Sequence, residues 1–121
     1  MNFVGIGAVA ALFGVGLGAF GAHGLRPRLT PEALAVYQTG VQYHLYHALG
    51  LVGVGLWMLK TGAPRELMAA GWLFVAGIVL FSGSLYVLAA TGWKRLGAVT
   101  PFGGLCFMAG WAVLALAAFQ R

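Results

Sequence analysis

The charged residues of this chain are few, and they stand in short groups separated by long uncharged stretches. Among 121 residues, seven are lysine or arginine and two are aspartate or glutamate. These nine are Arg26, Arg28, Glu32, Lys60, Arg65, Glu66, Lys94, Arg95 and Arg121. The uncharged runs between them cover residues 1–25, 33–59, 67–93 and 96–120. Each run exceeds the about 20 residues that a helix needs to cross a hydrocarbon core of about 30 Å.

These runs predict a membrane protein. Charged residues make up 7% of the chain and hydrophobic ones 61%, whereas soluble domains have about 25% and about 45–50%. Backbone groups in lipid must be satisfied within the chain, so each run is predicted to be a helix. We predict one all-α domain over residues 1–121, an integral membrane four-helix up-down antiparallel bundle. Its helices are predicted at about residues 3–22, 31–59, 66–90 and 97–119.

The connections between the predicted helices are short, which favours antiparallel neighbours. Thr30, Pro31 and Glu32 form a helix start: an N-cap, a proline in the first turn and an acid near the positive helix end. The second helix is longer than the bilayer requires, so we expect it to tilt or to bend near Gly40. The side with the first and third loops has four basic residues against three on the other side. The positive-inside rule then places both termini outside the cytoplasm.

The same basic residues bear on the expected partners. The net charge is +5, but the positive residues lie in loops and at the last residue, without a contiguous patch. This pattern is typical of membrane anchors that reach toward lipid phosphates. We therefore expect membrane lipids as partners, and we expect no nucleic acid. Gly14 and Gly18 form a pair that marks a close-packing face of the first helix. Glycine-rich faces on the first and fourth helices suggest a homo-oligomer or a place in a larger membrane complex.

Polar side chains gather at one depth of the predicted bundle. They lie in the first half of the second helix, the second half of the third and the start of the fourth. An up-down arrangement brings these parts into one leaflet, where unpaired polar groups cost free energy. We predict a polar pocket that opens toward the first-loop side. Its residues are Gln38, Gln42, Tyr43, His44, Tyr46, His47, Ser82, Ser84, Tyr86 and Thr100.

The histidines are the candidates for chemistry in this pocket. His44 and His47 are three residues apart and share one helix face. Such a pair can hydrogen-bond its neighbours, ligate a metal or haem iron, or lie on a proton or solute pathway. His23 is a third candidate ligand. The sequence identifies no cofactor. It also predicts no catalytic residue, because Ser82 and Ser84 lack an acid partner for a triad.

Four stretches resemble a known family. They are Gly-Ala-Phe-Gly-Ala-His-Gly-Leu at 18–25, Tyr-Gln-Thr-Gly-Val-Gln-Tyr-His-Leu-Tyr-His-Ala-Leu at 37–49, Leu-Phe-Ser-Gly-Ser-Leu-Tyr at 80–86 and Thr-Pro-Phe-Gly-Gly at 100–104. With these residues the chain resembles the YgdD/YwdK-like family of small inner-membrane proteins, a domain-of-unknown-function family. The resemblance implies a multi-pass protein of the cell (inner) membrane with four helices. It implies no activity and no catalytic residue.

Three functions are open. The first is a non-enzymatic bundle that self-associates or joins a membrane complex. The second is a transporter or channel subunit for a small solute or ion. Four short helices enclose little space, so a pore would need oligomers or a very narrow path. The third is a haem- or metal-binding membrane protein that uses His44 and His47.

Overall fold

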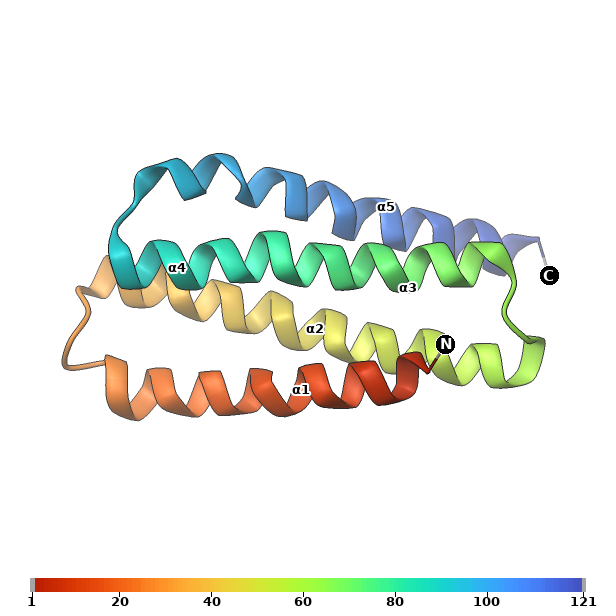
Figure 1. Cartoon of the computed structure of the whole chain (residues 1–121), viewed down its shortest axis with the longest axis horizontal. Coiled ribbons are helices and arrows are strands. Elements are labelled where there is room, and N and C mark those ends of the chain that lie inside the picture. The colour runs from red at the N-terminus through yellow and green to blue at the C-terminus, as the bar shows by residue number, and fades with distance from the viewer. Residues whose placement is uncertain (1, 121) are drawn as a thin grey trace.

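The chain folds into four long helical segments. The computed structural model describes residues 2–120, and these residues contain no strand. The first segment, Phe3–Leu25, consists of α1 (Phe3–Phe20) and a π turn η1 (Gly21–Leu25), and the second is α2 (Pro31–Thr61). The third, Arg65–Thr91, consists of α3 (Arg65–Gly77), a π turn η2 (Ile78–Ser82) and α4 (Gly83–Thr91). The fourth, Lys94–Phe119, consists of a 3-10 turn η3 (Lys94–Ala98) and α5 (Thr100–Phe119). The prediction of an all-helical chain with four helices is confirmed, and successive segments run in opposite directions (Figure 1).

The helix ends follow from local chemistry. The backbone N–H of Ala33 donates to Oγ1 of Thr30 at 3.1 Å, and Pro31 occupies the first turn, so the predicted start of α2 is confirmed. Gly62 (φ 82°) ends α2, and Gly92 (φ 71°) ends α4. Residues with a side chain rarely adopt a positive φ, so glycine suits both turns.

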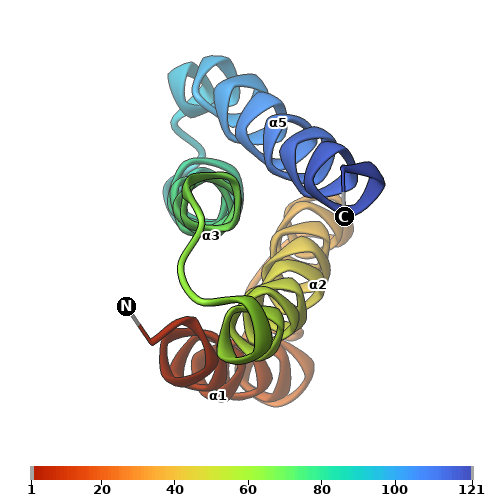
Figure 2. The ribbon, with the colours of Figure 1, turned by 90° about the vertical axis from the view of Figure 1, so that its right-hand side faces the viewer.

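α2 is a single unbroken helix of 31 residues, about 46 Å long at 1.5 Å per residue. It does not bend at Gly40; instead it lies inclined to α3, which Figure 2 shows nearly end-on. Each of the other three segments is long and apolar enough to cross a membrane. α2 is longer than any of these segments but less apolar, because the glutamine, tyrosine and histidine residues of its first half lower its mean hydropathy.

The helices pack in chain order. α1 lies on α2, α2 lies on α3, η2 and α4, and α5 lies on α3 and η2. Within residues 2–120, α1 and α5 pack on each other much less than the pairs named above do. They lie on opposite sides of α2 and α3 when the molecule is seen along its long axis (Figure 2). One side of α2 is therefore left uncovered by the other helices.

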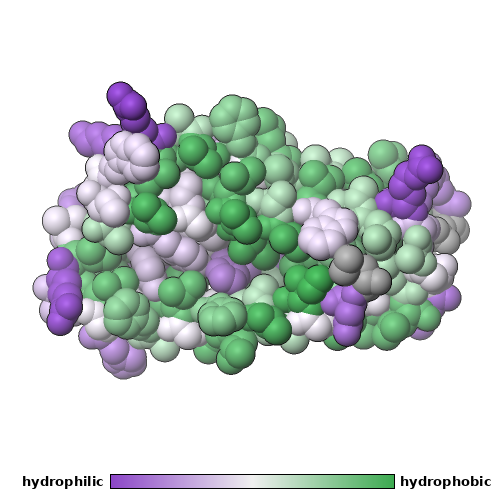
Figure 3. All heavy atoms as spheres, viewed as in Figure 1, coloured by the Kyte–Doolittle hydropathy of each residue, from purple (hydrophilic) through white to green (hydrophobic). Residues whose placement is uncertain are grey.

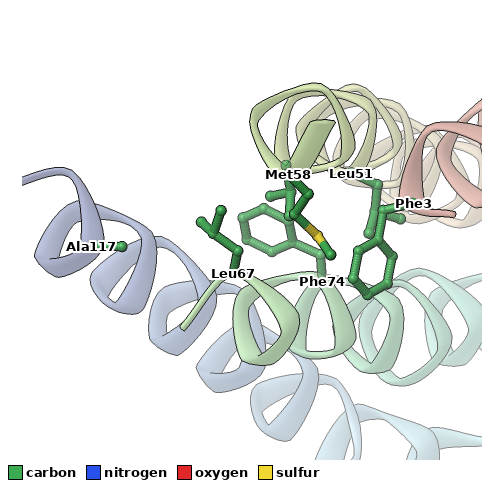
Figure 4. Packing of buried hydrophobic residues seen from close by; sticks show 7 residues of the cluster. Phe3, Leu51, Met58, Leu67, Phe74 and Ala117 are labelled. Carbon is green, nitrogen blue, oxygen red and sulfur yellow. The ribbon is translucent and has the colours of Figure 1, made fainter. Parts of the chain in front are cut away.

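The main hydrophobic core lies where the N-terminus meets α2, α3 and α5. Phe3, Leu51, Leu67 and Phe74 are fully buried there, and Phe3 packs edge-on against Trp72 at 5.5 Å between ring centroids. Figure 4 shows side chains of α1 and α2 meeting Phe74 of α3. This cluster fixes the end of the molecule opposite the first loop.

The helices approach most closely at glycines. A Cβ placed on Gly103 of α5 would overlap the backbone of Phe81 in η2. A Cβ on the next residue, Gly104, would have its nearest neighbour at 3.9 Å, again on Phe81. The sequence Gly103-Gly104 thus carries one glycine that contact requires and one that it does not.

The π turn η2 rotates the buried face of the third segment. In α3 the buried residues Ala70, Phe74 and Gly77 follow helical spacing, and a regular helix would next bury Phe81. The wider turn inserts one residue, so Ser82 becomes the fully buried position instead. Ser82, the last residue of the turn, and Tyr86 in α4 consequently face α2.

Polar and apolar surfaces alternate along the long axis. On the face shown in Figure 3, strongly hydrophilic residues gather toward the two ends, and hydrophobic residues cover most of the length between them. A small polar patch lies near the middle of this apolar belt. The belt and its polar ends are what a bilayer and its two interfaces require.

Candidate functional site: the polar residues at mid-height

The polar side chains of α2 lie at the middle level of all four segments. Tyr46 is the middle residue of α2, and Gly14 is that of Phe3–Leu25. A Cβ on Gly14 would lie 3.2 Å from the His44 ring. Phe107, at the middle of Lys94–Phe119, stacks on His47 with ring centroids 3.5 Å apart. Residues 42–47 therefore lie about midway between the two ends of the molecule.

His44 joins three helices. It is 6% exposed, and its Nε2 lies 2.7 Å from the carbonyl oxygen of Ala10 in α1. Its Nδ1 lies 2.8 Å from the hydroxyl of Tyr86 in α4. A carbonyl only accepts, so Nε2 carries the proton, and in the neutral ring Nδ1 accepts from Tyr86.

His47 is held in the opposite tautomer. It is 4% exposed, and its Nδ1 donates to the carbonyl oxygen of Tyr43 at 2.8 Å. Nε1–H of Trp111 in α5 donates to Nε2 of His47 at 2.9 Å. An indole nitrogen can only donate, so Nε2 must keep its lone pair and the ring must be neutral. The ring lies between Phe107, stacked on it, and Phe74, edge-on at 5.2 Å.

Other polar side chains at this level also form hydrogen bonds between segments. Ser82 donates to the carbonyl oxygen of Gly40 in α2 at 2.6 Å, and Tyr37 donates to that of Leu17 in α1 at 2.5 Å. The hydroxyls of Ser84 and Thr100 lie 2.6 Å apart and link α4 to α5. No buried side-chain nitrogen or oxygen within residues 2–120 lacks a partner.

The other predicted pocket residues lie on exposed positions of α2. Gln38, Gln42, Tyr43 and Tyr46 are all exposed, and Nε2 of Gln42 donates to the hydroxyl of Tyr46 at 2.8 Å. His23 is exposed in η1, away from the other two histidines in the sequence and in the fold. The structure thus does not gather the ten predicted pocket residues in one place. Four form pairs between helices, His44 with Tyr86 and Ser84 with Thr100. His47 and Ser82 are buried at separate contacts, and the remaining four are exposed on α2. A shared role in ligand binding stays a prediction.

Two grooves border the histidines. One, of about 350 Å³, is lined by aromatic and apolar side chains with His47 among them: Tyr43, His47, Phe81, Gly104, Phe107, Met108 and Trp111. The other, of about 290 Å³, lies between α1 and the third segment with His44 on its wall. Both are mostly apolar, which suits lipid chains better than a hydrated solute.

Trp111 is the residue of this site that the sequence prediction missed. A tryptophan near the middle of an apolar helix needs an acceptor for its N–H, and this need could have identified Trp111 from the sequence.

The geometry is unfavourable for a metal site, because both ring nitrogens of His44 and of His47 already have partners. In the part of the chain that the structure describes, no three His, Cys, Asp or Glu residues cluster.

The fold and its apolar belt define the class of protein: a small multi-pass membrane protein whose helices contact lipid. Residues 17–104 match the family described as "Protein of unknown function (DUF423)". The chain is 52% identical over 118 residues to the UPF0382 membrane protein YwdK of Bacillus subtilis (strain 168), covering 98% of this chain and 96% of that protein. It is 45% identical over 118 residues to the UPF0382 membrane protein SH2409 of Staphylococcus haemolyticus (strain JCSC1435), covering 98% and 95%.

This chain belongs to the DUF423 family, and its resemblance to the YwdK-like proteins is confirmed. The match extends over nearly the whole length of the relatives, so it covers all four helical segments. No solved structure matches the chain.

Proposed function

We propose that this protein is a non-enzymatic membrane assembly protein, which acts by binding other membrane proteins through its lipid-facing surface. The observation that supports this best is that both ring nitrogens of His44 and of His47 are engaged by the protein itself. Ligation of a metal or haem iron needs a nitrogen with a free lone pair, and neither histidine offers one to a bound molecule. The polar groups at mid-height serve instead to join helices.

The proposal includes α2 as a fourth membrane span, which makes the protein an up-down antiparallel bundle. Two observations support this. The middle of α2 lies level with the middles of its neighbours, as the contacts of Gly14 and Phe107 indicate. The buried polar side chains of α2, such as His44 and His47, have hydrogen-bond partners on adjacent segments or on α2 itself, which lowers their cost in hydrocarbon.

The alternatives have less support from the geometry. Ligation of haem or metal through Nε2 of His47 would break the bond from Trp111. A transport path would need a continuous polar route, whereas the two grooves beside the histidines have mostly apolar walls. Both remain outcomes of the experiment below.

The test has two measurements on the full-length protein. The first is the absorption spectrum and metal content after purification in mild detergent, beside a His44→Ala/His47→Ala variant. We expect neither haem nor metal in stoichiometric amount; a band or metal that disappears in the variant would make the cofactor reading the correct one.

The second measurement is photo-crosslinking in native membranes. A photoreactive residue is placed singly at Leu12, Gln42, Val79 or Met108, which together sample α1, α2, the third segment and α5. We expect adducts heavier than the monomer from at least one of these positions. Monomer alone from all four would overturn an assembly function.

A further inference from the structure

One stripe of α2 faces outward along its whole length. It consists of Gln38, Gln42, Tyr46, Leu49, Gly53 and Leu56, all exposed and all on one side of the helix. From Gln42 onward the spacing alternates between four and three residues, which is the spacing of a left-handed helix–helix contact. We call these six residues the α2 outer face. It is the side of α2 that the other helices leave uncovered.

The polar residues of this face lie where lipid cannot satisfy them. Tyr46 is the middle residue of α2, about 22 Å along the helix from either end. Gln42 is one turn away, about 6 Å along the axis. Headgroups and water begin about 15 Å from the bilayer centre, so the Gln42 amide and the Tyr46 hydroxyl lie within hydrocarbon.

The bond between these two side chains does not satisfy them. Gln42 donates one N–H to the Tyr46 hydroxyl at 2.8 Å. Within residues 2–120, Oε1 of Gln42 accepts no hydrogen bond and the Tyr46 hydroxyl donates none. One acceptor and one donor on this exposed face therefore have no partner within the chain at mid-bilayer. Each is costly there, which is how intramembrane polar groups come to mark contacts between proteins.

We infer that the α2 outer face is the interface with a second copy of this chain, in which Gln42 pairs with Gln42 of the other copy. An amide carries both a donor and an acceptor, so two glutamines related by a two-fold axis complement each other. Gly53, one heptad beyond Tyr46, faces open space and has no side chain, so another helix can approach closely there. A single polar position within such a seam fixes the register of the two helices.

This inference rests on the proposed assembly function and adds the partner and the face. The first test uses single cysteines in a Cys106→Ala background, oxidised in native membranes. Gln42→Cys and Tyr46→Cys are expected to form disulfide-linked dimers. Leu12→Cys on α1 and Met108→Cys on α5, each 69% exposed in the native residue, are the controls and are expected to stay monomeric.

The second test measures the dissociation constant of the dimer in liposomes by energy transfer between labelled copies. Gln42→Leu is expected to raise it about tenfold. Gln42→Asn, which keeps an amide, is expected to recover part of that loss. The leucine variant removes only an exposed polar group, so its helix content by circular dichroism is expected to equal that of wild type.

The outcomes separate the two proposals. A dissociation constant unchanged in Gln42→Leu, or disulfide dimers through Leu12→Cys or Met108→Cys instead, would overturn the α2 interface and leave assembly standing. A photo-adduct at Gln42 that mass spectrometry identifies as a different protein would also overturn self-association through this face. Monomer under every condition would overturn both.

Discussion

His44 and His47 differ in tautomer because their neighbours differ. The partner of Nε2 in His44 is a carbonyl, which requires a proton on that nitrogen, whereas the partner of Nε2 in His47 is the indole N–H of Trp111, which requires a lone pair. Two histidines one helical turn apart are thus set in opposite states by the helices on either side of α2.

This difference is directly measurable. In protein labelled with ¹⁵N at the histidine rings, we expect a protonated Nε2 in His44 and a protonated Nδ1 in His47 at neutral pH. His23 is exposed and provides a reference for free exchange between tautomers. Identical spectra for all three rings would contradict the hydrogen bonds described here.

The bond from Trp111 to His47 predicts a coupling between the two positions. Trp111→Phe removes the indole N–H donor and leaves the His47 ring stacked on Phe107. A double-mutant cycle with His47→Phe is expected to give a coupling free energy of about 0.6 kcal/mol, the usual size of a hydrogen bond between membrane helices. Unfolding in mixed micelles supplies the values.

Trp93→Phe is the control for that cycle, because Trp93 lies exposed between α4 and η3. It is expected to leave the free energy of unfolding unchanged. A coupling of zero between Trp111 and His47 would mean that the two side chains are independent in the bilayer.

At the scale of the helices, Gly103 and Gly104 make a matched pair. Gly103→Ala would place a methyl group against the backbone of Phe81, which cannot yield as a side chain can. We expect it to lower the free energy of unfolding by about 1–3 kcal/mol. Gly104→Ala adds the same methyl group where the nearest atom is 3.9 Å away, and it is expected to be neutral or to stabilise the helix by up to about 1 kcal/mol.

Thermal unfolding in detergent checks both variants. Equal losses would show that α5 does not approach η2 as closely as the structure places it. A loss at Gly104 alone would point to a different rotation of α5.

The sequence predicted where the helices lie along the chain better than which of their faces are buried. The positions of the charged residues delimit four runs, and those runs became the four helical segments. Thr30 marked the start of α2 because its side chain accepts from the helix backbone. The register of the third segment was not predictable in this way, because the π turn at Ile78–Ser82 has no marker such as proline.

The candidate site shows the same limit. The depth of its polar residues followed from an up-down arrangement, and His44 does meet Tyr86 of a distant helix. Which side chains point outward did not follow, because the cost of exposing Gln42 and Tyr46 to lipid predicted burial for both. A single chain need not bear that cost alone if a second chain covers the face.

At the scale of the whole molecule, the membrane crossing of α2 is the step to test. Single cysteines at Arg28, Ala63 and Trp93, in a Cys106→Ala background, report the three loops. A membrane-impermeant maleimide added to intact cells labels only cysteines on the outside. If α2 spans the bilayer, it labels either Ala63→Cys alone, or Arg28→Cys and Trp93→Cys without Ala63→Cys.

The positive-inside rule predicts that Ala63→Cys is the one labelled from outside. Labelling of Arg28→Cys and Ala63→Cys from the same side would show that α2 lies along the membrane surface. Cell lysis before labelling is the control, since all three cysteines are then expected to react.

Three of the bonds between helices end on main-chain carbonyls, those of Ala10, Leu17 and Gly40. Every amino acid carries this acceptor, so the identity of these residues is not what the contact demands. Size matters at Gly40. A larger residue there, where a Cβ would lie 2.9 Å from the Tyr86 ring, would separate α2 from α4. Relatives could therefore keep the same network with other residues at positions 10 and 17, as long as position 40 stays small. Only the donor half of each bond would then be visible in a comparison of sequences.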